Sequence, residues 1–337
     1  HAGSARGYRT VAMSALARLR PDNFTLALLA TVLLASFFPA SGLAAQWLDT
    51  GTDIAIAVLF FLHGARLPRQ ALVAGALHWR LHLLILACTF VLYPLLGLAA
   101  GPLARLALTP ELALGLLFLC ALPSTVQSSI AFTSMAGGNV AAAVCSASLS
   151  SLLGVFLTPG LMTLLAGSSG AMADPLAAVG KIMLLLLAPF VAGHLLRPWI
   201  GARLDAARPL LRYTDQGTIL LVVYAAFGAA VLEGLWRNTP LPALLLTAAT
   251  CALLLGIAMP LVWLIARRSG FDRADQIAIL FCGTKKSLAT GVPIAKVLFA
   301  GGPLGAIVLP VMLYHQLQLI VCAIVAARLG KQTNRAH

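Results

Sequence analysis

The sequence predicts an all-α polytopic membrane protein with ten transmembrane helices. Three observations support this fold class. Of the 337 residues, 60% are hydrophobic and only 10% are charged, a balance that no water-soluble domain needs. Apolar runs near 20 residues, long enough to cross the hydrocarbon core as helices, occur ten times. Lysines and arginines gather in alternate loops between these runs and in both terminal segments, which requires an even number of spans.

The predicted spans are distributed along almost the whole chain. They are expected near residues 22–39, 52–67, 79–100, 111–135, 139–166, 175–196, 212–233, 241–266, 274–298 and 303–327. Residues 1–12 precede Met13, look like a cloning remnant and are excluded from the fold. Residues 330–337 are expected to form a cytoplasmic tail.

Basic residues are divided very unevenly between the two sets of loops. Leaving aside the N-terminal tail and two lysines in mid-span, 15 lie on one side, and only Arg105, Lys181, Arg237 and Lys296 lie on the other. The positive-inside rule makes the first side cytoplasmic, so both termini are expected in the cytoplasm of an inner-membrane protein. The net charge of +13 therefore indicates membrane topology rather than nucleic-acid binding. The basic, amphipathic stretch 196–213 is expected to be a linker along the inner interface.

Residue types that serve catalysis or metal binding are scattered in this sequence. All six cysteines lie inside apolar segments without a CxxC pair, so they are expected to be small core residues. The ten acidic residues fall near predicted span ends, with Asp53, Asp215 and Asp275 the deepest. No acid pair, HExxH motif or GxSxG motif occurs in the sequence. We therefore expect no enzyme activity, no metal and no cofactor.

One stretch of the ninth predicted span combines charge with helix-breaking residues. Lys285 and Lys286 lie about halfway along it. Residues that do not favour an uninterrupted helix surround them: Gly283, Thr284, Ser287, Gly291 and Pro293. A charge near the bilayer centre costs at least ~2.5 kcal/mol and normally faces a polar cavity, where irregular backbone is also tolerated. The stretch predicts a broken helix at a binding site; the alternative is a re-entrant cytoplasmic loop whose lysines reach the headgroups.

A weak internal repeat relates the fourth and ninth spans. Each contains a short aromatic–cysteine segment, a break, and an Ala-Gly-Gly turn: Phe118-Leu-Cys120 and Ala136-Gly-Gly-Asn139 in one, Phe281-Cys282 and Ala300-Gly-Gly-Pro303 in the other. A unit of five spans is odd, so its second copy enters the membrane the other way up. Residues 22–166 and 175–329 are thus predicted to be inverted five-helix repeats, with the site where the two breaks meet.

The fourth-span break is rich in polar side chains. Residues 123–134 contain six hydroxyls and one amide, which are costly in lipid unless they find partners. Beside the helix-breaking Pro123, we expect Gln127, Ser128 and Ser129 to contribute to the site. Polar residues of the fifth span are Asn139, a further site candidate, and four serines that equally suit helix packing: Ser146, Ser148, Ser150 and Ser151.

Other polar groups lie inside the third and tenth spans. Thr89 occurs in the third, and His315, Gln316 and Gln318 occur in the tenth. Thr89 and His315 are site candidates; a lone histidine there is either a packing residue or a proton relay, since its charge changes near neutral pH.

The two central lysines have no acidic residue near them in the sequence. Their cavity should therefore be positive and favour an anionic solute. Desolvation disfavours the charged form of a buried lysine, so one lysine is also a candidate coupling group that is charged in some states and neutral in others.

Two segments resemble the bile acid:sodium symporter superfamily, within it the SBF-like branch that includes the seventh member of solute carrier family ten. They are Leu122-Pro-Ser-Thr-Val-Gln-Ser-Ser-Ile-Ala-Phe-Thr-Ser134 with Gly138-Asn-Val140, and Cys282-Gly-Thr-Lys-Lys-Ser-Leu-Ala-Thr-Gly-Val-Pro293. The resemblance covers residues 20–328. It implies ten helices in two inverted repeats, with helices four and nine unwound and crossing. It also implies a core domain (spans three to five and eight to ten) and a panel domain (spans one, two, six and seven).

The sequence departs from sodium-coupled members of that superfamily at their ion site. Two sodium ions in those relatives are held by a glutamate and a glutamine of span nine, a glutamine of span three, and amide and hydroxyl groups of spans four and five. The matching positions here are Phe281, Lys285, Thr89, Ser128 with Ser129, and Ala143 with Ala147. The sodium-binding carboxylate is therefore missing, and a lysine occupies part of the site.

The leading functional prediction is a secondary active transporter of a small organic anion, without the usual sodium coupling and with a proton favoured as coupling ion. Two alternatives remain open. One is a regulatory or scaffold membrane protein in calcium or glycoconjugate homeostasis, and the other is a sodium-coupled organic-anion symporter.

Overall fold

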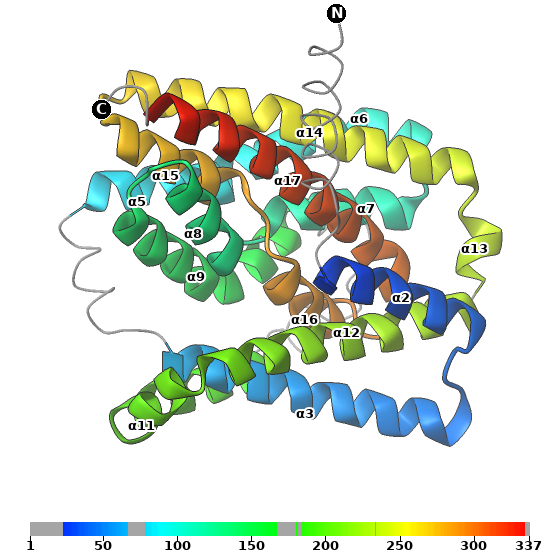
Figure 1. The fold of residues 1–337 in the computed structure, drawn as a ribbon. Coiled ribbons are helices and arrows are strands. Elements are labelled where there is room, and N and C mark those ends of the chain that lie inside the picture. The colour runs from blue at the N-terminus through cyan, green and yellow to red at the C-terminus, as the bar shows by residue number, and fades with distance from the viewer. Residues whose placement is uncertain (1–22, 67–77, 167–179, 181–182, 233, 334–337) are drawn as a thin grey trace, which may run out of the picture.

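The computed structural model describes residues 23–66, 78–166, 180, 183–232 and 234–333, and these ranges are almost entirely helical, without a β-strand (Figure 1). The elements are α2 (Asn23–Phe37), α3 (Gly42–Arg66), α5 (Trp79–Ala87), η1 (Cys88–Leu92, a π-helix), α6 (Tyr93–Ala107), α7 (Pro110–Ala121), α8 (Val126–Met135), α9 (Val140–Ala166), η2 (Met183–Leu187, a π-helix), α11 (Ala188–Ala206), α12 (Arg208–Leu232), α13 (Leu235–Asn238), α14 (Leu241–Arg268), α15 (Arg273–Thr284), α16 (Leu288–Leu298) and α17 (Leu304–Thr333). The predicted N-terminal remnant and residues 334–337 of the predicted tail lie outside the described residues, whereas residues 330–333 form the end of α17.

Many of these helices have the length and composition of membrane spans. Within the described ranges, eight are long and apolar enough to cross a membrane, or nine if α7 and α8, bent by 60° at their break, form one span. A shorter apolar helix covers Leu26–Phe37. The chain is therefore a polytopic α-helical membrane protein, as the sequence predicts. The count of ten spans and the inverted repeats stay predictions.

Two boundaries predicted from the sequence are wrong. The second span does not start at residue 52, because α3 begins ten residues earlier, at Gly42. Its acidic first half, which resembles a loop in sequence, is helical and pairs with a lysine of α16. The stretch 196–213 is not a loop either, because α11 continues to Ala206 and α12 begins at Arg208. Basic side chains are compatible with a helix that extends beyond the apolar layer.

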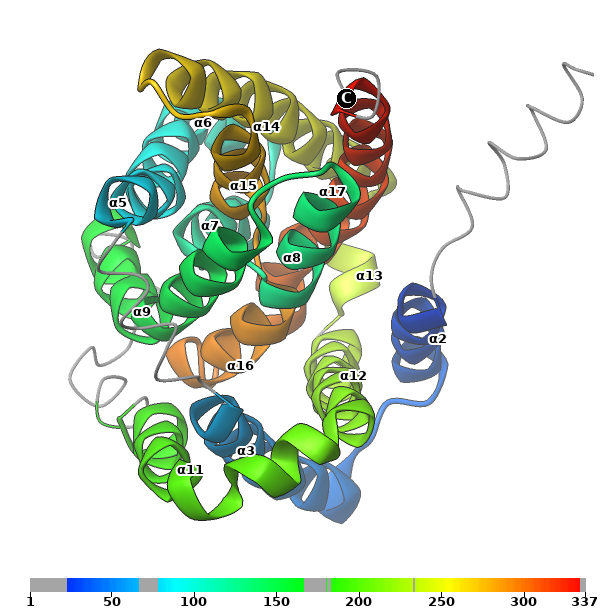
Figure 2. The ribbon, with the colours of Figure 1, turned by 60° about the vertical axis from the view of Figure 1, so that its left-hand side comes forward.

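The helices form two groups. Figures 1 and 2 show α2, α3, α11 and α12 together on one side of the molecule, a set we call the panel group. Helices α5–α9 and α14–α17 lie on the other side and form what we call the core group. The two groups meet where α12 packs against α16 and α17.

The segment formed by α15 and α16 is the most enclosed part of the protein. In its most apolar 18-residue window 94% of the residues are buried, against 17–50% for the other candidate spans. Because other helices surround this segment, its backbone can leave the helical conformation without exposing peptide groups to lipid.

Candidate binding site at the crossing of two broken helices

Two broken helices cross through their non-helical residues. Residues 122–125 separate α7 from α8, and residues 285–287 separate α15 from α16. At the crossing, the backbone N–H of Ser287 donates to the carbonyl oxygen of Pro123 at 2.9 Å. The proline also causes its own break, since the residue before a proline avoids the α region, and Leu122 is extended, with φ −71° and ψ 150°. The sequence therefore predicts both interruptions correctly.

Two glycines allow the segments to approach this closely. A Cβ atom on Gly154 of α9 would lie 2.5 Å from Cβ of Pro123, and one on Gly291 of α16 would lie 2.7 Å from Cδ1 of Leu122. Real side chains do not tolerate such distances. The break between α7 and α8 is therefore packed against glycines of α9 and α16.

The Lys286 side chain is buried inside the crossing, with 1% of its surface exposed. Its ammonium donates to the carbonyl oxygens of Thr89 (2.8 Å), Cys120 (3.0 Å) and Leu122 (2.8 Å). It also lies 4.2 Å from the centre of the Tyr93 ring. Cys120 and Leu122 belong to the C-terminal end of α7, where unpaired carbonyls and the helix dipole favour a cation. All three ammonium protons are thus used by main-chain oxygens.

The backbone of Lys286 is fixed from α17. Its N–H donates to Oε1 of Gln318 at 2.9 Å, and Nε2 of Gln318 donates to its carbonyl oxygen at 2.8 Å. The same Nε2 lies 3.1 Å from Nδ1 of His315. One amide side chain therefore supplies the hydrogen bonds that the broken helix lacks at this residue.

A tyrosine pair closes the end of α15. The hydroxyls of Tyr93 and Tyr314 both donate to the carbonyl oxygen of Thr284, at 2.7 and 3.0 Å, and lie 2.6 Å from each other. The Thr284 hydroxyl donates back to Leu280 O at 2.6 Å. The last carbonyl of α15 is thereby satisfied without water.

Lys285 has a different environment from its neighbour. Its side chain is completely buried, and its ammonium lies 4.4 Å from the centre of the Phe132 ring of α8. The ammonium has no hydrogen-bond partner in the described part of the chain. The hydroxyl of Thr133, next to Phe132, is also buried without a partner. In the described ranges the Lys285 ammonium is therefore a buried positive charge without a hydrogen-bond acceptor.

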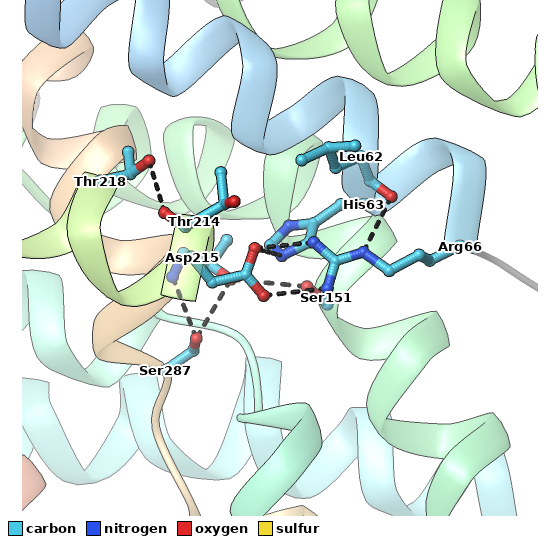
Figure 3. A network of polar contacts seen from close by, with 9 residues as sticks. Leu62, His63, Arg66, Ser151, Thr214, Asp215, Thr218 and Ser287 are labelled. Atoms are coloured by element: carbon cyan, nitrogen blue, oxygen red, sulfur yellow. Dashed lines mark hydrogen bonds and ion pairs between the residues drawn. The ribbon is translucent and has the colours of Figure 1, made fainter. Parts of the chain in front are cut away.

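Hydroxyl groups connect the breaks to α8, α9 and α16. Ser150 Oγ accepts from the Ser124 N–H at 3.0 Å, and Ser129 Oγ donates to Phe281 O at 3.4 Å. Ser287 caps α16 by accepting from Thr290 N–H at 3.1 Å. Figure 3 shows Ser287 and Ser151 in this hydroxyl chain, which includes a 3.5 Å contact between Ser151 and Thr290.

Residues 22–331 match the model of the SBF-like CPA transporter family. The chain belongs to this family. It is 60% identical over 319 residues, 95% of this chain and 96% of the relative, to an uncharacterized protein of Pseudomonas aeruginosa. It is 52% identical over 314 residues (93% and 94%) to "Putative symporter YfeH" of Escherichia coli K12. It is 29% identical over 319 residues (92% and 94%) to "Sodium/bile acid cotransporter 7" of Danio rerio.

These matches confirm the resemblance that the two motifs indicate. The protein is a membrane transporter of the bile acid:sodium symporter superfamily and not an enzyme. What the relatives' names say of sodium and bile acid applies to those proteins.

The structure of this SBF-like transporter does not bring every predicted site residue to the crossing. Asn139 instead binds the start of α15, where its Nδ2 donates to Asp275 at 2.8 Å. The break lies at the other end of that 12-residue helix, about 18 Å away. Gln127 is exposed, and Ser128 is half-buried and contacts Thr125 at 3.2 Å. Gly283 packs against Cys88, and Pro293 is buried inside α16.

The sequence reasoning missed several polar residues of this transporter. Tyr93, Tyr314 and Thr158, which donates to Ala121 O at 2.8 Å, interact with the helix ends. The sequence offered one signal for them, because each carries a hydroxyl group inside a predicted membrane span (the third, tenth and fifth, respectively). In the panel group, Asp215 accepts two hydrogen bonds from Arg66, at 3.0 and 2.7 Å, beside His63 (Figure 3).

Proposed function

We propose that this protein is a secondary active transporter that moves a small organic anion across the inner membrane by alternating access, without a sodium ion at the crossing. We also propose that both termini lie in the cytoplasm. The observation that carries the proposal is the pair of fully buried lysines at the crossing. None of the ion pairs in the described ranges includes either lysine, so their charge is not neutralised by a carboxylate.

Two further features favour a negative ligand. Helices α8 and α16 both begin at the crossing, so their positive dipole ends face the region between the breaks. Broken helices in other secondary transporters direct such N-termini towards the anionic group of the solute. Lys285, whose ammonium lacks a partner, is the residue we assign to the anion.

Lys286 provides the reason to exclude sodium. Three carbonyl oxygens at 2.8–3.0 Å surround its ammonium, an all-oxygen environment of the kind that a small cation would otherwise occupy. A side chain of the protein supplies the positive charge there. Sodium could enter this position only if the Lys286 side chain moved out of it. Coupling to a proton is consistent with this arrangement, because the ammonium of a lysine can release and regain a proton.

The test is the thermal stability of the detergent-purified protein with small carboxylates, sulfated solutes and phosphorylated solutes, with and without sodium, from about pH 5.5 to pH 9. We expect at least one anion to raise the melting temperature, without an effect of sodium. The anion effect should weaken as the pH rises, because an anion stabilises only the charged form of a lysine. A shift with sodium alone would instead support the sodium-coupled alternative.

Variants of Lys285 make this test specific. Lys285→Ala and Lys285→Gln should each abolish the anion shift. Lys331→Ala, which removes an exposed lysine near the end of α17, is the matched control and should keep the shift. Unchanged anion binding in both Lys285 variants would refute the assignment.

One observation favours a second candidate function, a scaffold protein without transport. Lys285 and Lys286 are 0% and 1% exposed, so the crossing is sealed in this conformation, as a scaffold requires. A scaffold would show no solute-dependent stability for any member of the panel, and uptake into proteoliposomes would equal that of empty vesicles.

A further inference from the structure

We propose that Lys296 and the acidic residues of α3 form a latch that closes the transport path at the face opposite the basic loops. This inference rests on alternating access as proposed above, and it assigns a specific residue to one of its two barriers. Lys296 lies in the last turn of α16, in the core group, whereas its partners lie in the panel group. The contact therefore joins the two bodies that must separate.

The geometry is that of a closed clamp. The Lys296 ammonium lies 2.6 Å from Oδ1 of Asp53 and 3.0 Å from Oδ1 of Asp49, and it donates to Asp49 O at 2.9 Å. Thr52 accepts a further hydrogen bond from it. Asp49 and Asp53 are four residues apart on α3, so their carboxylates share one face of the helix. The lysine side chain is 11% exposed, whereas the side chains of Asp49 and Asp53 are 69% and 40% exposed, so solvent screens the two ion pairs in part.

Other ion pairs of the described ranges do not link the two groups. Arg66 and His63 contact Asp215 inside the panel group, and His78 contacts Asp275 inside the core group. Among the ion pairs of the described ranges, those of Lys296 with Asp49 and Asp53 link the panel group to the core group.

Beside the latch the interface has a cavity and a smooth packing surface. The cavity has a volume of about 310 Å³ and is lined by Asp49, Asp53 and Lys296 together with small apolar residues of α12. A Cβ atom on Gly305 of α17 would lie 2.6 Å from Cβ of Ala230, so the two helices touch there without interlocking side chains. Such a surface can part without repacking. The latch is then the specific contact that holds this face shut.

The proposal is tested by the accessibility of a buried cysteine, a measurement that needs no solute. Ala226→Cys places a thiol on α12 at a residue that is 4% exposed and lies in the cavity wall facing α17. It is labelled with a membrane-impermeant thiol reagent, applied separately to each side of oriented vesicles. Ala229→Cys, one turn away in the same wall and already exposed, is the matched control. Protein without an added cysteine gives the background from the native thiols.

With the latch intact, Ala229→Cys should react and Ala226→Cys should react slowly. Adding Lys296→Gln should accelerate labelling of Ala226→Cys roughly tenfold, the factor that corresponds to losing about 1.4 kcal/mol from the closed state. The acceleration should be seen only from the face opposite the basic loops. Lys296→Arg, and the reversed pair Lys296→Asp with Asp53→Lys, should restore slow labelling.

Three results would overturn the latch. They are fast labelling of Ala226→Cys with the latch intact, no acceleration in Lys296→Gln, and acceleration from the face of the basic loops. None of them depends on the solute. If no anion raises the melting temperature but the labelling follows the expectation, the proposed solute is wrong and the latch is supported. If an anion raises the melting temperature but the labelling does not follow the expectation, the latch is wrong and the anion site is supported.

Discussion

The two adjacent lysines should respond differently to the same substitution. Lys286→Met removes a positive charge and keeps most of the side-chain volume, and it leaves the three carbonyls of Thr89, Cys120 and Leu122 without their shared donor. Lys285→Met removes a charge that has no hydrogen-bond partner. The same loss of charge therefore leaves three buried acceptors unsatisfied in one variant and none in the other.

The magnitudes follow from these contacts. Hydrogen bonds to a charged group contribute about 1.5–3 kcal/mol each, so three contribute roughly 5–9 kcal/mol. The variant recovers several kcal/mol that burial of the charge costs, which leaves Lys286→Met about 3 kcal/mol less stable. Lys285→Met mainly loses the contact between the ammonium and the Phe132 ring, which contributes about 2 kcal/mol when desolvated. The variant no longer has to bury a charge, and this gain offsets the loss. We therefore expect the stability of Lys285→Met to equal or exceed that of the parent protein.

The assay is the apparent melting temperature of each purified variant, measured under identical detergent conditions. At about 2 °C per kcal/mol for a chain of this size, Lys286→Met should melt roughly 6 °C below the parent protein. Lys285→Met should melt at the parent temperature or above it. Lys331→Met is the exposed control. Equal losses for both central lysines would show that the carbonyl contacts of Lys286 do not distinguish the two residues.

Two further predictions concern the packing and hydrogen bonds of the breaks. Gly291→Ala should destabilise the protein by about 1–3 kcal/mol in the same assay, because its Cβ would lie 2.7 Å from Leu122, whereas Gly256→Ala, with nothing within 4 Å, should be neutral or stabilising. A neutral Gly291→Ala would show that the break has room to relax. Tyr93→Phe and Tyr314→Phe should each cost about 1 kcal/mol, since the other tyrosine still satisfies the carbonyl at the end of α15. The double variant should cost more than their sum, and strict additivity would contradict a shared acceptor.

The sequence predicts the two breaks well because their causes are local. Pro123 excludes the helical conformation for the residue before it, and Ser287 caps the helix that follows. The sequence cannot distinguish Lys285 from Lys286 by composition. In an extended segment successive side chains point in opposite directions, so the partners of each lysine depend on which helices pack on the two sides. Phe132 on one side and Tyr93 on the other are set by tertiary structure.

The misplaced boundaries and the outlying candidate have physical reasons as well. Asp49 and Asp53 make the start of α3 look like a loop, but a distant lysine compensates their charge. Asn139 has the polarity of a site residue, yet it caps α9 and binds Asp275 at the start of α15. Sequence spacing places it near the fourth-span break, whereas the intervening helix carries it away.

The hydrogen bond between Ser287 N–H and Pro123 O joins the two broken helices through main-chain atoms alone. No substitution at either residue can change the chemical nature of that acceptor, and only a proline in place of Ser287 would remove the donor. Sequence divergence can therefore alter the side chains around the crossing while the backbone that presents them keeps the same geometry. If the solute binds at the crossing as proposed, such a transporter can change its solute specificity while the contact between its two broken helices stays the same.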